Sequence, residues 1–308
     1  MLRYIGRRLL QTIPVFFGAT FLIFAMVYLM PGDPVAALGG DRGLSESAAA
    51  QIRAQYNLDK PFWMQYLLYL KGVFTLDFGK AFNGQPVIDL IAGAFPVTIR
   101  LALYAMAIET ILGITLGVIA GVKRGGWFDS TVLVLSLALI SVPTFVLGFV
   151  LQFFLGVKLG WLPTTASNSV TFESLTMPAM VLGGVSLAYV IRLTRQSVSQ
   201  NVSADYVRTA RAKGLIKRKA LTRHALRTAL IPMATYFAFA LATLFTGAAI
   251  TERVYGWHGM GEYSISAISG MDINGVTAVV AFSGLCTLTG ALLSDVFVAI
   301  VDPRVRVS

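Results

Sequence analysis

Six apolar segments, each long enough to cross a lipid bilayer, constrain this chain more than any other feature of its sequence. A transmembrane helix needs about 20 mostly apolar residues, and hydrocarbon leaves unsatisfied any backbone polar group that a helix does not pair internally. Only 13% of the residues are charged, whereas a soluble domain carries roughly 25%. The sequence therefore predicts an all-α integral membrane protein with six transmembrane helices, at residues 9–30, 97–121, 130–155, 175–193, 229–250 and 276–301.

The first apolar segment follows Arg3, Arg7 and Arg8, an arrangement that also occurs in secretory signal peptides. Signal peptides have apolar cores of about 7–15 residues, and this run extends from residue 9 to residue 30. We therefore interpret residues 1–30 as a retained first transmembrane helix, with cleavage after it as the alternative. The other predicted regions are an extracytoplasmic loop at 31–96, a transmembrane core at 97–302 and a tail at 303–308.

The net charge of +10 is divided unevenly between alternate loops. If the N terminus lies in the cytoplasm, the inside segments hold 17 Lys and Arg residues and three acids, whereas the long outside loop holds five basic residues and six acids. Short loops rich in Lys and Arg stay on the cytoplasmic side of a membrane. We therefore expect both termini in the cytoplasm. Because the charge sorts by membrane side, the lipid bilayer is an expected partner and nucleic acid is not.

The long outside loop contains two expected helices. "SESAAAQIRAQYNL" combines a Ser N-cap with an early Glu, which is typical of a helix start. "PFWMQYLLYLKGVF" has the pattern of an aromatic amphipathic helix, and aromatic rings of this kind favour the membrane interface. We predict a small outside cap that lies on the bilayer between the first and second spans.

Few polar residues lie deep within the predicted spans. Glu109 and Asp295 are the acids there, and charged groups inside a membrane are costly and often functional. They either serve a pathway or gating role or complete interhelix hydrogen bonds, with Arg100 as a candidate partner. Pro143 removes one backbone hydrogen bond and predicts a kink in the third span, which either forms a cavity or fits a neighbouring helix.

Gly113, Gly117 and Gly121 form a stripe without side chains along the second span. Such a stripe lets another helix approach closely, either within the chain or in a second subunit. One cysteine and two histidines in different loops leave no expected disulfide or metal site. No G-x-x-x-x-G-K-[ST] motif and no plausible catalytic constellation occur, so the chain is expected to bind no ATP of its own and not to be an enzyme.

The segment "DYVRTARAKGLIKRKALTRHALRTALIP", at residues 205–232, holds eight Lys or Arg residues and one acid. Ser203 is a candidate N-cap for a helix at 204–213, and Gly214 suits the following position, where the backbone needs positive φ. A second helix is expected at 217–230, and Pro232 opens the fifth span.

Small residues at Ala210, Ala212 and Gly214 give this hairpin an expected tip that the surface of another protein can approach closely. Topology alone needs only a few positive residues, whereas this segment devotes about 30 residues to ordered helix. We interpret it as a docking element. The alternative is a basic loop that lies against anionic lipid.

The motif "DYVRTARAKGL…RHALRTALIP" resembles the cytoplasmic loop of ATP-binding-cassette importer permeases, in the dipeptide, oligopeptide and nickel branch. The resemblance extends over nearly the whole chain, through "MPGDPVAALGG", "PVIDLIAGAFPVTIRLAL", "GAAITERVYGWHGMGEYSISAI" and "DPRVR", and is closest to the B-type subunit. The general importer loop begins Glu-Ala-Ala. This chain has Arg208, Thr209 and Ala210 there, with Gly214 in register, as the peptide branch does.

The resemblance implies a type I importer permease fold in a bacterial inner membrane, with a coupling loop at about 196–230 that enters a groove of a cytoplasmic ATPase. The coupling residues that it implies are Asp205, Tyr206, Arg208, Thr209, Ala210, Arg211, Ala212, Lys213 and Gly214. It also implies a second homologous permease, two ATPase domains that hold ATP and Mg²⁺, and an extracytoplasmic substrate-binding protein. Trp257 and His258 are candidates for the face that meets this receptor.

The branch also implies a solute class. Di- and oligopeptides are the expected substrates, since few charged residues lie in the spans, and nickel chelates or haem-like compounds are alternatives. A stand-alone channel or secondary carrier is the competing functional class, and an ATPase that copurifies with the chain would exclude it.

Overall fold

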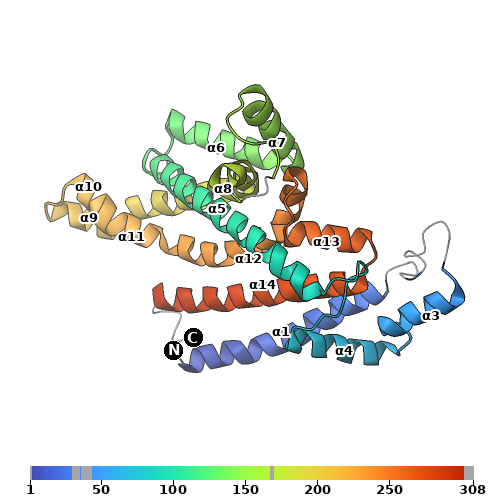
Figure 1. The fold of residues 1–308 in the computed structure, drawn as a ribbon. Coiled ribbons are helices and arrows are strands. Elements are labelled where there is room, and N and C mark those ends of the chain that lie inside the picture. Colours follow the sequence, from blue (N-terminus) through green and yellow to red (C-terminus); the bar gives the residue numbers. More distant parts are fainter. Residues whose placement is uncertain (1, 30–34, 36–43, 167–169, 302–308) are drawn as a thin grey trace. The chain divides into compact units, whose positions relative to one another are not determined.

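The computed structural model describes residues 2–29, 35, 44–166 and 170–301, with the backbone alone described at 2–5, 8–9, 217, 224, 234–235, 238–239, 241–247 and 293–301. Helices form nearly all of the regular structure in these residues (Figure 1). Lys80 and Pro86 make an isolated antiparallel bridge, and the described part holds no strand. The all-α prediction is therefore confirmed for this part of the chain.

The described chain divides into two compact units. The N-terminal unit comprises Leu2–Ile99 and Trp257–Thr289, and the central unit comprises Arg100–Gly256 and the chain from Gly290. Two long helices, α5 (Val87–Val122) and α14 (Ile273–Val301), contribute residues to both units.

The N-terminal unit also contains α1 (Leu2–Tyr28), α3 (Glu46–Gln55), α4 (Phe62–Thr75) and α13 (Met260–Ser269). Helix α3 begins as predicted, because the Ser45 side chain accepts a hydrogen bond of 3.3 Å from the backbone N–H of Ala48. This bond satisfies one of the free donors of the first turn. Helix α4 ends at Leu76, which adopts a left-handed conformation.

Aromatic rings join α4 to α1, and the two helices lie side by side (Figure 1). Phe21 stacks on Trp63 with centroids 5.7 Å apart, and Phe16 lies 5.8 Å from Phe74. The pairing runs antiparallel, since later residues of α1 meet earlier residues of α4. The predicted amphipathic helix therefore uses its rings for packing within the chain.

Helix α5 begins ten residues before the predicted second span, at Val87 instead of residue 97, and continues through Pro96. The early turns are helical because Val87 and Ile91 are buried in a core that also contains Met260 of α13 and Val279 of α14. Tertiary burial thus extends the helix into what the sequence predicts as loop.

The central unit is arranged around α8 (Phe172–Val202), a helix whose start is fixed by reciprocal bonds between Thr171 and Ser174. Helix α8 contacts several other helices, among them α6 (Trp127–Ser141), α7 (Thr144–Leu151), α11 (Leu226–Ala229) and α12 (Ile231–Tyr255). Most of its side chains up to Ser199 are buried, as expected of a helix enclosed by others.

The predicted third span is not one kinked helix. Helix α6 ends at Ser141, and the chain bends by 104° before α7 and the π-helix η2 (Gln152–Lys158) continue. Val142 adopts an extended conformation because it precedes Pro143, which disfavours helix at the preceding residue. The proline therefore breaks the span.

Helices α1, α5, α8 and α14 are long and apolar enough to cross a membrane, and the bent pair of α6 with α7 and η2 would add one span. Helix α12 has 25 residues, which also suffices in length, but several of its side chains lie outside the described ones. Large exposed apolar side chains such as Leu22, Met26 and Ile111 fit helices that face lipid. The count of six spans remains a prediction.

Candidate functional site

The predicted docking hairpin begins with α9 (Asp205–Ala212), which directly follows α8. Its N-cap is Ala204, and no side chain caps it. The prediction of Ser203 as N-cap is wrong because Ser203 is instead the C-cap of α8. Asp205 lies in the first turn, where a carboxylate interacts favourably with the helix dipole.

A glycine in the left-handed conformation follows the C-terminal end of α9. Gly214 has a φ of +91°. Its N–H donates to the carbonyl of Arg211 at 3.0 Å, and the N–H of Leu215 donates to the carbonyl of Ala210 at 3.2 Å. These two bonds form a Schellman motif, which satisfies the last carbonyls of the helix. The predicted position of Gly214 is confirmed.

The second arm of the hairpin runs through α10 (Lys217–Ala220), the π-helix η3 (Leu221–Ala225) and α11. This continuous helical stretch confirms the prediction for 217–230, with a π-helical turn in its middle. It lies against α9 (Figure 1). Pro232 lies in the first turn of α12, as predicted.

One face of α9 is buried against the second arm. Val207 is 5% exposed and Ala210 is 8% exposed, and Val207 joins a small core with Ala220 and Ala225. Ala210 is therefore not part of an exposed tip, in contrast to the prediction. Ala212, two residues later, is exposed.

The opposite face of α9 is exposed and basic. Its exposed residues are Asp205, Tyr206, Arg208, Thr209, Arg211, Ala212 and Lys213. Arg208 and Asp205 form an ion pair of 3.7 Å, but both side chains are largely exposed, so the pair adds little stability. Arg211 and Lys213 make no ion pair within the described residues, so their charges are available to an acidic surface.

A short polar chain fixes α9 to α8. The Tyr206 hydroxyl donates to Oδ1 of Asn201 at 2.5 Å, and the Asn201 amide donates to the carbonyl of Ser197 at 2.8 Å. Together with the buried contacts of Val207, the Tyr206 bond ties α9 to the end of α8.

Helix α8 is in turn attached to α6 by an ion pair that the sequence analysis did not anticipate. Arg195 forms a bidentate pair with buried Asp129, with a distance of 2.7 Å from Nη2 to Oδ2. Asp129 also accepts a bond of 2.9 Å from the N–H of Gly125. Nearby, Arg124 donates to the Ser199 hydroxyl at 3.1 Å. Both charges were recognisable at inside ends of predicted spans, but their sequence separation hid the pairing.

The glycine stripe of α5 packs against α8 of the same chain. A Cβ at Gly113 would lie 2.5 Å from a methyl group of Val190, and a Cβ at Gly117 would lie 2.6 Å from Cβ of Thr194. A Cβ at Gly121 would lie 2.8 Å from the carbonyl oxygen of Arg195. The helices approach so closely that glycine is required at these positions.

The polar residues within the spans do not form one site. Glu109 is fully buried on α5, and its carboxylate oxygens have no hydrogen-bond partner in the described part. Arg100 is exposed and makes no described bond to Glu109, so the suggested pair is not formed. The side chain of Asp295 lies outside the described ones.

The two receptor-facing candidates differ in exposure. Trp257 is 4% exposed, so it is not available to a partner on this surface. The His258 side chain is 91% exposed, with Nδ1 3.6 Å from Oε2 of Glu262. Within the described residues, no group of three or more His, Cys, Asp or Glu side chains could hold a metal ion.

Comparison with known proteins assigns this chain to a family. The family model described as "Binding-protein-dependent transport system inner membrane component" matches residues 113–307, and the corresponding N-terminal model matches residues 1–102. The dipeptide transport system permease protein DppB of Escherichia coli (strain K12) is 36% identical over 99% of both chains. The oligopeptide permease OppB of Haemophilus influenzae is 33% identical over 99% of this chain and 100% of its own.

Solved structures share the fold at lower identity. The MetNI methionine ABC transporter, in an inward-facing conformation, aligns with a TM-score of 0.59 and 17% identity over 69% of this chain and 96% of that chain. An amino acid ABC transporter with histidines aligns with a TM-score of 0.54 and 16% identity, over 68% of this chain and 92% of that chain. On the strength of the family models and the full-length relatives, this chain belongs to the inner membrane components of binding-protein-dependent transport systems, among the permeases of ABC peptide importers.

Proposed function

We propose that this chain is the permease subunit that forms half of the translocation path in an ATP-driven importer of di- or oligopeptides. In this proposal both termini lie in the cytoplasm, and a second homologous permease completes the path. The observation that carries it is α9, a helix closed at its C-terminal end by a Schellman motif, with one buried face and one exposed basic face.

Helix α9 is suited to transmit a displacement that another protein imposes on it. Val207 on its buried face packs with residues of α10 and η3, and Tyr206 is bonded to Asn201 at the end of α8. Helix α8 is joined to α6 through Asp129 and to α5 through the glycine stripe. A displacement of α9 would therefore move several helices together instead of bending a loop.

The partner that α9 would contact is a cytoplasmic ATPase, which binds ATP and Mg²⁺ and supplies the free energy. Arg208, Arg211 and Lys213 are exposed on the free face, so we expect acidic residues in the groove that receives them. Two such ATPase domains and an extracytoplasmic substrate-binding protein complete the proposed complex.

The relatives support a peptide solute. Their names describe dipeptide, di/tripeptide and oligopeptide transport, at identities of 33–36% over nearly the full length. Nickel chelates and haem-like compounds remain alternative solutes. Dipeptide bound to the purified receptor protein would distinguish among these.

A bulky residue on the free face of α9 tests the proposal. Ala212→Trp places an indole on the exposed surface, where it should block the ATPase contact without disturbing the core. In proteoliposomes with the partner ATPases and the binding protein, we expect ATP-dependent uptake of labelled dialanine to fall at least about tenfold. The abundance and thermal stability of the chain should not change.

Ala50→Trp is the matched control, because Ala50 is also an exposed helical alanine, on α3. We expect it to retain uptake within about twofold, since it lies outside the proposed contact. Full ATP-dependent uptake by the Ala212→Trp complex would contradict the proposal.

A further inference from the structure

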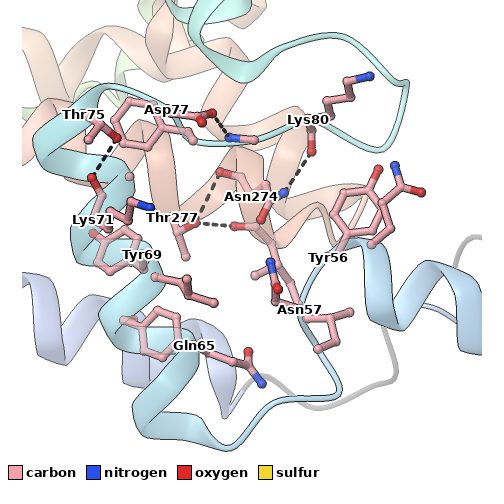
Figure 2. A pocket seen from close by; sticks show the side chains of 18 residues that line it. Tyr56, Asn57, Gln65, Tyr69, Lys71, Thr75, Asp77, Lys80, Asn274 and Thr277 are labelled. Atoms are coloured by element: carbon pink, nitrogen blue, oxygen red, sulfur yellow. Dashed lines mark hydrogen bonds between the residues drawn. The ribbon is translucent and has the colours of Figure 1, made fainter.

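A cavity of about 480 Å³ lies within the N-terminal unit. Its wall is formed by Phe24 of α1, by the turn between α3 and α4, by α4 itself, by the loop at 77–80 and by the first turn of α14 (Figure 2). Small-molecule sites in proteins typically have volumes of about 300–1,000 Å³. The cavity therefore has the size of a ligand site, and it is not part of the docking hairpin.

The wall is held by specific bonds before any ligand arrives. The amide of Asn274 donates to the carbonyl of Lys80 at 2.9 Å, and the N–H of Phe82 donates to the Asp272 carboxylate at 3.0 Å. A Cβ at Gly72 would lie 2.5 Å from the carbonyl oxygen of Asp77, so glycine permits α4 and this loop to meet. A preformed wall lowers the entropic cost of binding.

Three charged residues line the cavity, namely Lys71, Asp77 and Lys80. The ammonium of Lys71 extends toward the cavity, whereas the side chain of Lys80 points away from it (Figure 2). Lys71 makes no ion pair within the described residues. The carboxylate of Asp77 accepts one bond, of 3.2 Å, from the N–H of Gly79 and keeps capacity for further donors.

Asn57, which lines the cavity, and Leu76, which directly precedes the lining residue Asp77, have unusual backbone conformations. Asn57 has a φ of +56° and Leu76 has a φ of +58°, a region that residues other than glycine rarely adopt. Conformations of this kind cluster at functional sites. The Asn57 amide faces the cavity (Figure 2) and makes no side-chain hydrogen bond within the described residues, so it can bind a ligand.

We propose that this cavity binds a small zwitterion of the amino-acid and short-peptide class, with Lys71 on its carboxylate and Asp77 on its ammonium group. Of the two lysines, only Lys71 directs its ammonium at the cavity, and one ammonium suits a carboxylate better than a polyphosphate. The choice of solute rests on the proposed function, and in the proposed orientation the site lies outside the cytoplasm. The site is an additional one, distinct from the path between the two permeases.

Equilibrium binding of labelled dialanine tests this site. The chain is measured with its partner permease and ATPases in nanodiscs, without the substrate-binding protein, so that no other high-affinity peptide site contributes. Lys71→Met and Asp77→Asn should each raise the Kd at least about tenfold, since each removes a charge-assisted contact. Lys80→Met is the matched control, because its side chain points away, and its Kd should stay within about twofold of wild type.

Competition with blocked ligands separates the two charges. N-acetyl-dialanine lacks the ammonium and dialanine amide lacks the carboxylate, so each should compete at least about tenfold less well than dialanine. Inorganic phosphate should not compete. Equal binding by the Lys71→Met and Lys80→Met proteins, or equal competition by the blocked ligands, would overturn the inference.

The outcome is separable from that of the proposed function. If dialanine uptake depends on Ala212 but no Lys71-dependent binding is found, the cavity inference fails and the importer proposal stands. If binding depends on Lys71 but uptake is independent of the ATPases, the importer proposal fails and the cavity site stands.

Discussion

At the scale of single residues, Gly214 determines the end of α9 through its backbone and not through contacts. Its φ is +91°, and a Cβ there would meet no atom within 4 Å. Gly214→Ala should therefore cost about 1 kcal/mol of local stability from backbone strain alone. We expect ATP-dependent uptake to fall several-fold while the amount of protein in the membrane stays constant, with both measured on the same vesicles.

Gly84→Ala is the control for strain, because Gly84 has a φ of +83° and equally open surroundings. It lies in the loop before α5, so uptake should stay near the wild-type value. Equal losses of uptake in the two variants would show that strain acts through general folding and not through α9.

A second residue-scale prediction concerns pH. Burial raises the pKa of the Asp272 carboxyl above its ordinary value of 3.8, although bonds from the backbone N–H groups of Gly275, Phe82 and Asn274 lower it in part. A raised pKa means that the folded chain holds this proton more tightly than the unfolded chain does. The contribution to stability is therefore complete below pH 3.8 and is lost as the pH rises through the raised value.

Asp272→Asn mimics the neutral carboxyl and should remove this dependence. The difference in Tm, wild type minus variant, should decrease as the pH rises above 3.8, as measured by thermal unfolding of the purified chain. A difference that increases with pH would show that the ionised carboxylate is the stabilising form, through its bonds to Phe82 and Gly275.

Residue-level prediction from the sequence succeeded where the backbone dictates the residue type. Gly214 and the Ser45 N-cap follow from local chemistry, and both are present. Burial of Ala210 depends on the second arm of the hairpin, and the Asp129–Arg195 pair depends on how α6 meets α8. Such long-range contacts leave no mark in local spacing, so they could not be assigned in advance.

At the scale of elements, two prolines in apolar runs have opposite effects. Pro96 lies inside the continuous helix α5, whereas Pro143 follows an extended residue and separates α6 from α7. Neighbouring burial explains the difference for α5, because Val87 and Ile91 fix the turns before its proline. A proline in a sequence thus predicts a lost hydrogen bond, but packing decides whether the helix ends.

At the element scale, alanine substitution at two glycines of α5 should change the stability of the chain in opposite directions. Gly117→Ala must displace Thr194 and the carbonyl of Ile191, which lie 2.6 and 2.8 Å from the new Cβ, so it should destabilise the chain by about 1–3 kcal/mol. Gly93, on the same helix, has nothing within 4 Å of a new Cβ. Gly93→Ala should instead stabilise the helix by up to about 1 kcal/mol.

Thermal unfolding of the two alanine variants in one detergent gives the comparison. A lower Tm for Gly117→Ala and an equal or higher Tm for Gly93→Ala is the expected pattern. Equal shifts in the two Tm values would mean that close contact between α5 and α8 is not what requires glycine.

At the scale of the whole molecule, composition and loop charge predict a helical membrane protein, and the family comparisons agree. The hairpin was also predictable, because a dense basic run with capping signals is unusual in an apolar chain. The cavity was not predictable, since its wall combines residues near 24, 57, 77 and 274. Only the folded N-terminal unit brings these segments together.

The most direct test of the account asks what touches Ala212 in intact cells. A chain with Ala212→Cys and with its native thiol removed by Cys286→Ser presents one exposed sulfhydryl on α9. We predict that a short bifunctional cross-linker joins it to the ATPase subunit, whereas Ala50→Cys in the same background gives no such product. Absence of the ATPase product at Ala212, with dialanine uptake at the wild-type rate, would contradict the claim that α9 is the docking element.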